Sequence, residues 1–463
     1  SAAGKPAANS PWFNQDATHP FNVGYDFNHE SQATKDFVDR VIEHWLTRYK
    51  IDGFRWDLSN GFTQVNNPTN VGAWGNYDAS RIAIWKRIYD KMQAINANSY
   101  CILEHFADNS EEIELSNYGM LLWGNSNYNF SEATKGVISN SNFQYGIHTN
   151  RGWVNPHLIT YQESHDEERL MYKNLNEGNS NVSYNVRDLN TALKRNEAAA
   201  AFWAMIPGPK MLWQFGETGY DYSINTCENL TVDNACRLSP KPIRWDYYNN
   251  PNRKSLYDVY SAMLRLKITP QYLSTFTTNN VTWNLGSGFK WMILNELGLR
   301  VLIMGNFDIQ AQTGTVTFPV AGTWYSYLTG TTFTATGSAQ SLLLQPGEYY
   351  VYTDRNVSGT VVTPILNINA NLSNMKLKLY PNPANAATQI EYEIEESGRV
   401  EVVVTDMNGK KIADLYSGFK TRGKHQLAMS SNGFNVAKQA GGMYLLQTSI
   451  NGKRKVEKFV ISQ

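Results

Sequence analysis

The fold of this 463-residue chain is decided by the stretch Gly53-Phe-Arg-Trp-Asp57 and by two similar stretches, Tyr100–Glu104 and Leu158–Asp166. In each, a short apolar or aromatic run leads to an acidic residue at or just past its end. Parallel barrel strands present functional side chains in this way, because their carboxyl ends gather on one face. The sequence therefore predicts that carboxylates far apart in the chain meet on one face of a parallel sheet.

Helix-like and strand-like segments alternate around these stretches. Apolar spacing predicts helices over 31–49, 78–97, 110–116, 191–206 and 252–266, and strands over 54–57, 100–104, 120–123, 158–163 and 209–215. This alternation predicts an α/β fold with parallel βα units. Only about five such units can be found, whereas a closed (β/α)8 barrel needs eight. We therefore predict a partial TIM barrel.

A change in the pattern of apolar and polar residues near residue 273 predicts all-β structure in the rest of the chain. Short alternating runs separated by Gly- and Asn-rich turns are typical of antiparallel sheets, here interpreted as two β-sandwiches. The predicted domains are a loop-like segment at 1–30, the barrel at 31–272, a β domain at 273–354, a linker at 355–374 and a second β unit at 375–463.

The composition argues against nucleic acid and anionic membranes as partners. The 41 Lys and Arg balance the 41 Asp and Glu, so no long-range field favours nucleic acid or an anionic membrane. The sequence contains no uninterrupted apolar run of about 18 residues, so it predicts no transmembrane helix. The start of the chain also lacks a basic-then-apolar leader. Either the protein is cytoplasmic or an N-terminal part carrying the signal peptide is missing, and we favour the second.

Three cysteines occur. Cys101 lies in an apolar run and is expected to be a small buried hydrophobe. Cys227 and Cys236 flank a short polar loop. In an exported protein they would form one disulfide, and otherwise they are two free loop thiols.

The acidic residues also suggest a reaction class. Two carboxylates that flank a sugar bond, with a third assisting, suit retaining hydrolysis of a glycoside. Arg55 shares a strand face with Asp57, so it should lower the pKa of that carboxyl. The apolar neighbours of Glu104 should raise its pKa. The alternatives are a surface ion pair at Asp57 and a merely solvated carboxylate at Glu104.

In order and spacing, the three stretches resemble the second, third and fourth signature regions of glycoside hydrolase family 13, the α-amylase family. The resemblance implies a TIM barrel whose strands one to three lie outside this chain, and endo-hydrolysis of α-1,4 bonds in starch-like α-glucans. Glucan-transferring or neopullulanase-like activity stays open as an alternative. So does a non-catalytic glucan-binding surface protein.

Roles follow from the resemblance position by position. Asp57 would be the nucleophile, and Glu104 the general acid and then the base. Asp166 would stabilise the transition state, while His165 and Arg55 would assist substrate binding. The aromatic stretch 123–130 and the loop 217–222 would shape the acceptor side, although ordinary loop packing explains them equally well.

The first signature region of the family is missing. Tyr25-Asp-Phe-Asn28-His29 imitates it, but with the wrong spacing and no preceding strand. The resemblance implies instead that residues 1–30 are the end of the insertion after barrel strand three. Asn28 and His29 could cap a helix that starts at Ser31, or line the cleft. The family's calcium site depends partly on the missing region, so calcium is a possible cofactor whose ligands cannot be assigned. A half-open barrel by itself is not expected to turn over substrate.

The C-terminal segment has a likeness of its own. Leu377–Pro383, Asp406–Gly409, Gly442–Leu445 and Lys458–Ile461 resemble the C-terminal sorting domain of the type IX secretion system of Bacteroidetes. The resemblance implies export by that machinery and a secreted or cell-surface location at the outer membrane. The alternative is an ordinary accessory or sugar-binding β-sandwich.

Overall fold

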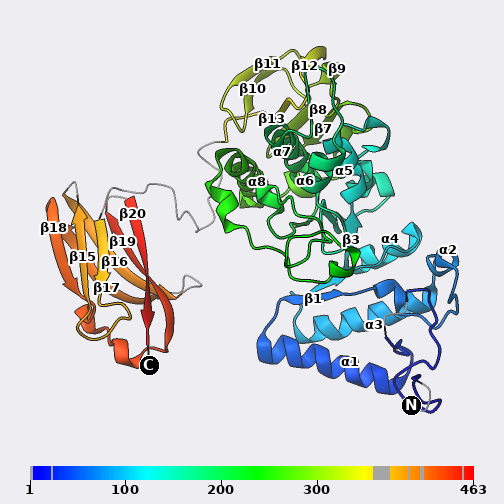
Figure 1. Ribbon diagram of the computed structural model, residues 1–463, viewed down its shortest axis with the longest axis horizontal. Helices are drawn as coiled ribbons and strands as arrows, with labels where there is room; N and C mark the ends of the chain where they lie inside the picture. The colour runs from blue at the N-terminus through cyan, green and yellow to red at the C-terminus, as the bar shows by residue number, and fades with distance from the viewer. Residues whose placement is uncertain are drawn as a thin grey trace. The chain divides into compact units, whose positions relative to one another are not determined.

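The computed structural model describes residues 4–21, 24–357, 376–394, 397–406, 411–450 and 453–462 (Figure 1). It separates into two compact units, 1–362 and 363–463. Most of the predicted linker, from residue 358 on, lies outside the described residues. Within those residues no helix has the length and apolar character needed to cross a membrane.

A five-stranded parallel sheet lies at the centre of the first unit, and the predicted parallel α/β sheet is confirmed. Its strands follow one another in chain order: β1 (Gly53–Trp56), β2 (Tyr100–Leu103), β3 (Leu121–Asn125), β4 (Leu158–Tyr161) and β5 (Lys210–Met211). The predicted strand over 209–215 is too long. Because β4 ends at Tyr161, which pairs with Met211, residues beyond Met211 have no neighbour to pair with.

Eight α-helices are described in this unit. They are α1 (Gln32–His44), which continues into a π-helical turn (Trp45–Tyr49), α2 (Val71–Trp74), α3 (Ala79–Ile95), α4 (Asn109–Tyr118), α5 (Asn127–Lys135), α6 (Leu170–Glu177), α7 (Leu189–Met205) and α8 (Pro251–Ile268). The five predicted helices are present, but α2, α5 and α6 were missed. Helix α5 lacks an apolar period because its polar residues Asn127, Ser131 and Glu132 are buried together with Phe130.

Local contacts explain where the first helices begin. Asp78 caps α3, since its Oδ1 accepts hydrogen bonds from the backbone N–H groups of Ser80 and Arg81. Ser31 occupies the N-cap position of α1, but its hydroxyl donates to the Pro11 carbonyl instead of capping. The Oδ1 of Asn28 accepts from the Ser31 N–H at 3.1 Å. Asn28 therefore fixes the turn that leads into α1.

Helices α1 and α3 pack against the start of the parallel sheet. The α3 side chains Trp85, Ile88 and Met92 are buried in one cluster with Cys101 and Leu103 of β2. Cys101 is a free buried thiol, as predicted. This packing anchors the strands whose ends carry the acidic residues.

Antiparallel strands follow in the same unit. One sheet has the order β11-β10-β13-β8-β7-β6, and β12 pairs with β9. Their bounds are β6 (Val281–Asn284), β7 (Phe289–Asn295), β8 (Arg300–Asn306), β9 (Gln312–Thr317), β10 (Gly322–Ser326), β11 (Thr332–Ala335), β12 (Ala339–Leu344) and β13 (Tyr349–Thr353). One apolar cluster joins the two sheets through Leu302, Val316 and Leu344.

The second unit consists of antiparallel strands, as predicted. One sheet has the order β14-β15-β18 and the other β17-β16-β19-β20. The strands are β14 (Lys376–Tyr380), β15 (Gln389–Ile394), β16 (Gly398–Asp406), β17 (Lys411–Lys420), β18 (Gly423–Ala428), β19 (Gly442–Ile450) and β20 (Lys453–Ile461). Both sheets contribute to one core, which includes Ile390, Val402 and Leu446.

Candidate active site

Arg55 brings two of the predicted acids together at the ends of β1 and β2. It lies on the same strand face as Asp57, and its Nη1 contacts Asp57 Oδ1. Its Nη2 forms an ion pair with Glu104 Oε2 at 2.8 Å. The two carboxylates are therefore separated by no more than one guanidinium group and its two contacts. The structure thus places Asp57, Glu104 and Arg55 in a single cluster.

The two carboxylates differ in environment. The Asp57 side chain is 77% exposed, whereas that of Glu104 is 13% exposed. Burial raises the pKa of Glu104, and the neighbouring negative charge and side-chain contact of Asp57 act in the same direction. The Leu58 N–H and Arg55 oppose this rise. A buried carboxyl with a raised pKa beside an exposed carboxylate suits proton transfer and nucleophilic attack, respectively.

Trp123 of β3 supports the cluster from the next strand. The guanidinium carbon of Arg55 lies 4.1 Å from the Trp123 ring centroid, a cation–π contact. The His165 ring lies 6.2 Å from the same indole, edge to face. Trp123, predicted to shape the acceptor side, thus links Arg55 with the turn that follows β4. Tyr128, from the same predicted stretch, lies on helix α5 and not on a loop.

Asp166 lies in the turn after β4. Its Oδ2 is 3.1 Å from His165 Nε2, and its Oδ1 is 3.2 Å from Arg237 Nη2. Arg237 also donates to the Asp166 backbone carbonyl at 2.8 Å. Burial and the charges of carboxylates including Glu104 and Asp166 raise the pKa of Tyr161 on β4. The pKa of Tyr161 is therefore affected both by Glu104 at the end of β2 and by Asp166 in the turn after β4.

Sequence reasoning missed Arg237 as a site residue. It directly follows Cys236, which forms a disulfide with Cys227 across a Cα–Cα distance of 5.0 Å. Lys241 donates hydrogen bonds to the backbone carbonyls of Thr226 and Cys236, so the closed loop has internal support. The cysteine spacing suggested this loop, but no local pattern linked Arg237 to Asp166, 71 residues earlier.

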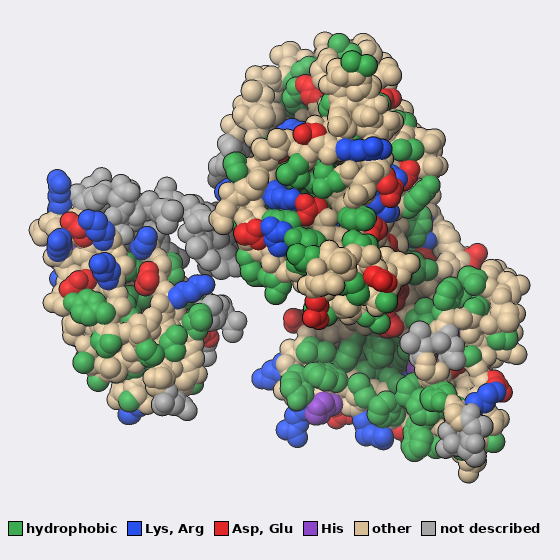
Figure 2. Space-filling view, in the orientation of Figure 1, with side chains coloured by type: hydrophobic (Ala, Val, Ile, Leu, Met, Phe, Trp, Pro, Cys, Tyr) green, Lys and Arg blue, Asp and Glu red, His purple; other side chains and the backbone are tan. Residues whose placement is uncertain are grey.

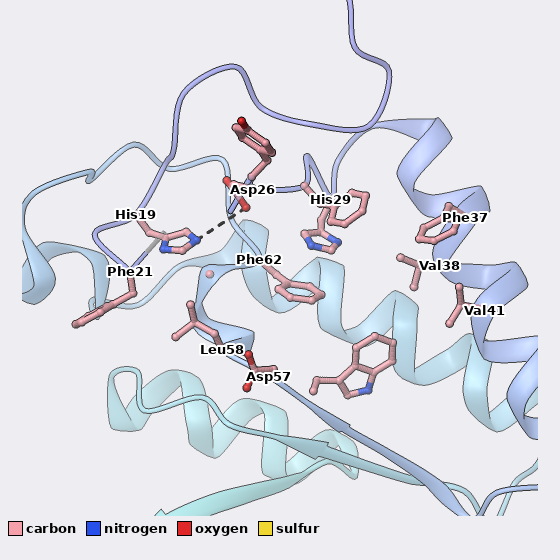
Figure 3. Close-up of a pocket in the computed structure, with 14 residues that line it drawn as sticks. His19, Phe21, Asp26, His29, Phe37, Val38, Val41, Asp57, Leu58 and Phe62 are labelled. Carbon is pink, nitrogen blue, oxygen red and sulfur yellow. Dashed lines mark ion pairs between the residues drawn. The ribbon is translucent and has the colours of Figure 1, made fainter. Parts of the chain in front are cut away.

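Asp57 also lines a cavity of about 390 Å³, lined mostly by apolar side chains (Figure 3). His29 lines the same cavity and stacks on Phe62 with ring centroids 3.6 Å apart. Burial lowers the pKa of His29 to about 3, and the positive charge of Arg87 adds to this effect. Figure 2 shows hydrophobic side chains gathered on this part of the first unit. Of the two residues left open by the sequence, Asn28 fixes a turn and His29 lines the cavity.

Asp26, in the stretch that imitates the missing signature region, has a local structural role. Its Oδ2 accepts hydrogen bonds from Asn14 Nδ2 at 2.7 Å and from the Thr18 hydroxyl at 3.1 Å. Its Oδ1 lies 3.9 Å from His19 Nε2 (Figure 3). These contacts hold the N-terminal loop against the cavity.

A second cavity, of about 460 Å³, lies beyond β5. It is lined by Leu212, Trp213, Gln214, Phe215, Glu217, Ile243 and Trp245. The Trp213 ring lies 5.8 Å from that of His165, so this cavity borders the turn that carries Asp166. Part of the predicted loop 217–222 contributes to it through Glu217.

Calcium is the one cofactor that the family resemblance leaves possible. Among the described residues, no group of three or more His, Cys, Asp or Glu side chains is arranged to hold a metal ion. Calcium stays a prediction from the family resemblance, and no reaction step is assigned to it.

Comparison with known families concerns the end of the chain. Residues 378–462 match the family model described as "Secretion system C-terminal sorting domain". This segment is a sorting domain. It indicates export through the type IX secretion system, in agreement with the motifs in the sequence. No curated protein matches the chain.

Solved structures show a likeness in fold. An α-amylase from Anoxybacillus is 13% identical with a TM-score of 0.53, and the match covers 75% of this chain and 71% of that chain. A cyclomaltodextrinase is 16% identical with a TM-score of 0.54, covering 76% of this chain and 56% of that chain. An α-amylase from Geobacillus thermoleovorans is 14% identical with a TM-score of 0.50 and 75% coverage of each chain. At such identities the likeness shows the fold.

Proposed function

We propose that the protein is a retaining glycoside hydrolase of the α-amylase type, acting on starch-like α-glucans. The observation that carries this proposal is the shared contact of Asp57 and Glu104 with Arg55. Carboxyl groups close to each other belong to the retaining reaction, whereas inverting enzymes keep theirs farther apart to admit water. The fold likeness to α-amylases supports the same reaction class.

In the first step Asp57 would act as the nucleophile. Its carboxylate attacks the anomeric carbon as the bond from that carbon to the glycosidic oxygen breaks. Glu104, whose pKa is raised by burial, would donate the proton of its protonated form to the leaving oxygen. The products of this step are the shortened glucan and a covalent glycosyl ester on Asp57.

In the second step Glu104 would act as the base. Its carboxylate takes a proton from water as the water oxygen attacks the anomeric carbon, and the ester bond to Asp57 breaks. The proton returns to Glu104 and Asp57 is released as a carboxylate. Where a sugar hydroxyl replaces the water, the same step transfers the glycosyl group, so transferase activity remains within this chemistry.

Asp166 and His165 would bind the hydroxyl groups of the sugar at the cleavage point. The Asp166 carboxylate also favours the positive charge that develops on the ring in the transition state. Arg55 would hold both catalytic carboxylates in position. The exposed position of Asp166, 46% for its side chain, leaves it open to a substrate.

Export fits a polymeric substrate. A sorting domain at residues 378–462 directs the chain out of the cell, where a glucan too large for uptake would be encountered. We therefore propose a secreted or cell-surface location, with the secretion machinery as the partner of the second unit.

Turnover tests the proposal. The full-length protein, in which the predicted barrel is complete, is incubated with a chromogenic α-maltoside and, separately, with starch, pullulan and cyclodextrin. Release of chromophore by the wild type, and its loss in Glu104→Gln, is expected. Short linear maltooligosaccharides from starch would indicate the amylase type, whereas preferential cleavage of cyclodextrin or pullulan would indicate the neopullulanase-like alternative. Binding of these glucans without any turnover would favour the non-catalytic alternative.

A further inference from the structure

The ends of β1 and β2 are joined by hydrogen bonds that fix Glu104. The Leu58 N–H donates to Glu104 Oε2 at 2.9 Å. The N–H of Ser59 donates to the Glu104 backbone carbonyl at 3.0 Å, and its hydroxyl donates to the same carbonyl at 2.9 Å. The segment directly after Asp57 therefore holds both the side chain and the backbone of Glu104.

Both strand ends turn through left-handed residues. Leu58, directly after Asp57, has φ 43°, and Phe106, two residues after Glu104, has φ 52°. Residues with side chains rarely adopt this conformation and do so at a cost in free energy, which surrounding contacts must offset. The two turns thus need an external support.

His105 provides that support between the two turns. Its ring is buried, with Nδ1 2.8 Å from the Ser59 hydroxyl and Nε2 2.7 Å from Glu111 Oε1. Glu111 Oε1 belongs to a carboxylate, which accepts, so Nε2 donates to it. Nδ1 and the Ser59 hydroxyl share the second hydrogen bond of the ring.

Glu111 is itself held in place by α3. It is fully buried on α4 and accepts two hydrogen bonds from Arg81, Nε to Oε1 at 2.7 Å and Nη2 to Oε2 at 2.8 Å. The Asp78 N–H donates to Oε2 at 2.9 Å. Two helices therefore fix the carboxylate that orients His105.

We propose that Glu111, His105 and Ser59 form a positioning network that holds the Glu104 carboxylate for proton transfer. This inference rests on the role proposed above for Glu104. Glu111 and His105 are positioning residues and touch no substrate, since they act through Ser59 and Leu58. A misplacement of about 1 Å in a reacting group can lower the rate by about 100-fold.

Helix α4 offers a matched control in the next residue. Glu112 has a side chain that is 1% exposed, against 0% for Glu111, and it also pairs with an arginine, Arg151. The His105 ring is bonded to Glu111 and not to Glu112. If only the burial of a charged pair mattered, Glu111→Gln and Glu112→Gln would change kcat and its pH dependence by the same amount.

The kinetic experiment compares Glu111→Gln, His105→Gln and Ser59→Ala with Glu112→Gln, all in the full chain. We expect kcat on a chromogenic α-maltoside to fall by about 100-fold in Glu111→Gln and His105→Gln, with KM nearly unchanged. The alkaline limb of kcat/KM should move to higher pH, because the Leu58 N–H bond that lowers the pKa of Glu104 is lost. Glu112→Gln should leave this limb in place. Equal movement in Glu111→Gln and Glu112→Gln, or none in either, would overturn the proposal.

A second measurement separates this proposal from the proposed function. The Glu104 carboxyl is titrated by NMR with 13C-labelled glutamate, and its signal is assigned by its loss in Glu104→Gln. The groups that act on it are Arg55 and Asp57 at the end of β1 and the Leu58 N–H. None of these residues is substituted in any variant, so a change in the midpoint reports a change in the position of the carboxyl group relative to them. A higher midpoint in Glu111→Gln but not in Glu112→Gln supports the network even if no glucan is hydrolysed. Identical midpoints in Glu111→Gln and Glu112→Gln would overturn the proposed network even if hydrolysis is confirmed. Ser59→Ala, a small change, repeats the test if the larger variants unfold.

Discussion

Arg55 forms a 2.8 Å ion pair with Glu104, a residue on the neighbouring strand, while its other terminal nitrogen contacts Asp57. The parallel register, in which Arg55 lies opposite Ile102, makes this possible, because Glu104 then extends past the end of β2 toward the same face. One guanidinium therefore acts on two carboxyl groups of different burial.

Removing the acid should separate the two reaction steps. We expect Glu104→Gln to lower kcat on a chromogenic α-maltoside by about 10²- to 10⁴-fold, the usual contribution of general acid–base catalysis. A substrate with a leaving group that needs no proton should be affected less in the first step. Initial rates on both substrates, with Glu114→Gln on the exposed side of α4 as control, check this. Equal loss on both substrates would contradict the role of Glu104 as the acid.

Removing the guanidinium should change the pH profile. Arg55 lowers the pKa of Glu104, so Arg55→Gln should raise it and move the alkaline limb of kcat/KM upward by about one pH unit or more. The control is Arg48→Gln, an exposed arginine on the π-helical turn after α1. A downward shift of the limb in Arg55→Gln would show that another group governs it.

His29 should make the protein sensitive to acid. Its pKa is about 3 in the folded chain, below the usual 6.5, so the unfolded state takes up the proton first. The stability that the neutral ring provides is present above pH 6.5 and is lost as the pH falls toward 3, by about 3 kcal/mol at pH 4.

Urea unfolding at pH 7 and pH 4 measures this loss. In His29→Phe, which keeps an aromatic ring against Phe62, the difference in unfolding free energy between the two pH values should shrink. The same change at the exposed His44, His44→Phe, should leave the difference as in the wild type. An unchanged difference in His29→Phe would mean that His29 is not the group that titrates.

The disulfide loop should support both stability and the site. Replacing Cys227 and Cys236 by Ser should lower the unfolding free energy by about 3 kcal/mol, from the chain entropy of a loop of this length. KM should also rise, because Arg237 follows the loop and holds Asp166. Arg237→Gln, with the disulfide intact, should raise KM with little loss of stability. A normal KM in both variants would remove the loop from the site.

Much of the core of the site could be predicted from the sequence. The alternation of strand side chains places Arg55 beside Asp57, and the apolar run before Glu104 predicts its burial. Both signals are local, since they depend on neighbours in the chain. The ion pair between Arg55 and Glu104 depends on strand register, which the sequence does not state.

Other features could not be predicted because they depend on distant contacts. His105 was not singled out, yet it bonds to Ser59, 46 residues earlier. Glu111 is a charged residue on a helix, and such residues usually face solvent. In the interior its charge is instead compensated by Arg81, and His105 contacts the same carboxylate. Helix α5 was missed for a similar reason, because its buried Asn127 donates to the backbone carbonyls of Gln162 and Glu168, more than 30 residues away.

The most direct measurement is a search for the glycosyl ester on Asp57. Glu104→Gln is incubated with an α-maltosyl fluoride, whose leaving group needs no acid, and the protein is analysed by intact mass and peptide mapping. We expect the mass to increase by one maltosyl unit, located on the peptide that contains Asp57, and Asp57→Asn to show no increase. A maltosyl unit on another residue, or turnover of the fluoride by Asp57→Asn at the wild-type rate, would contradict the double displacement through Asp57.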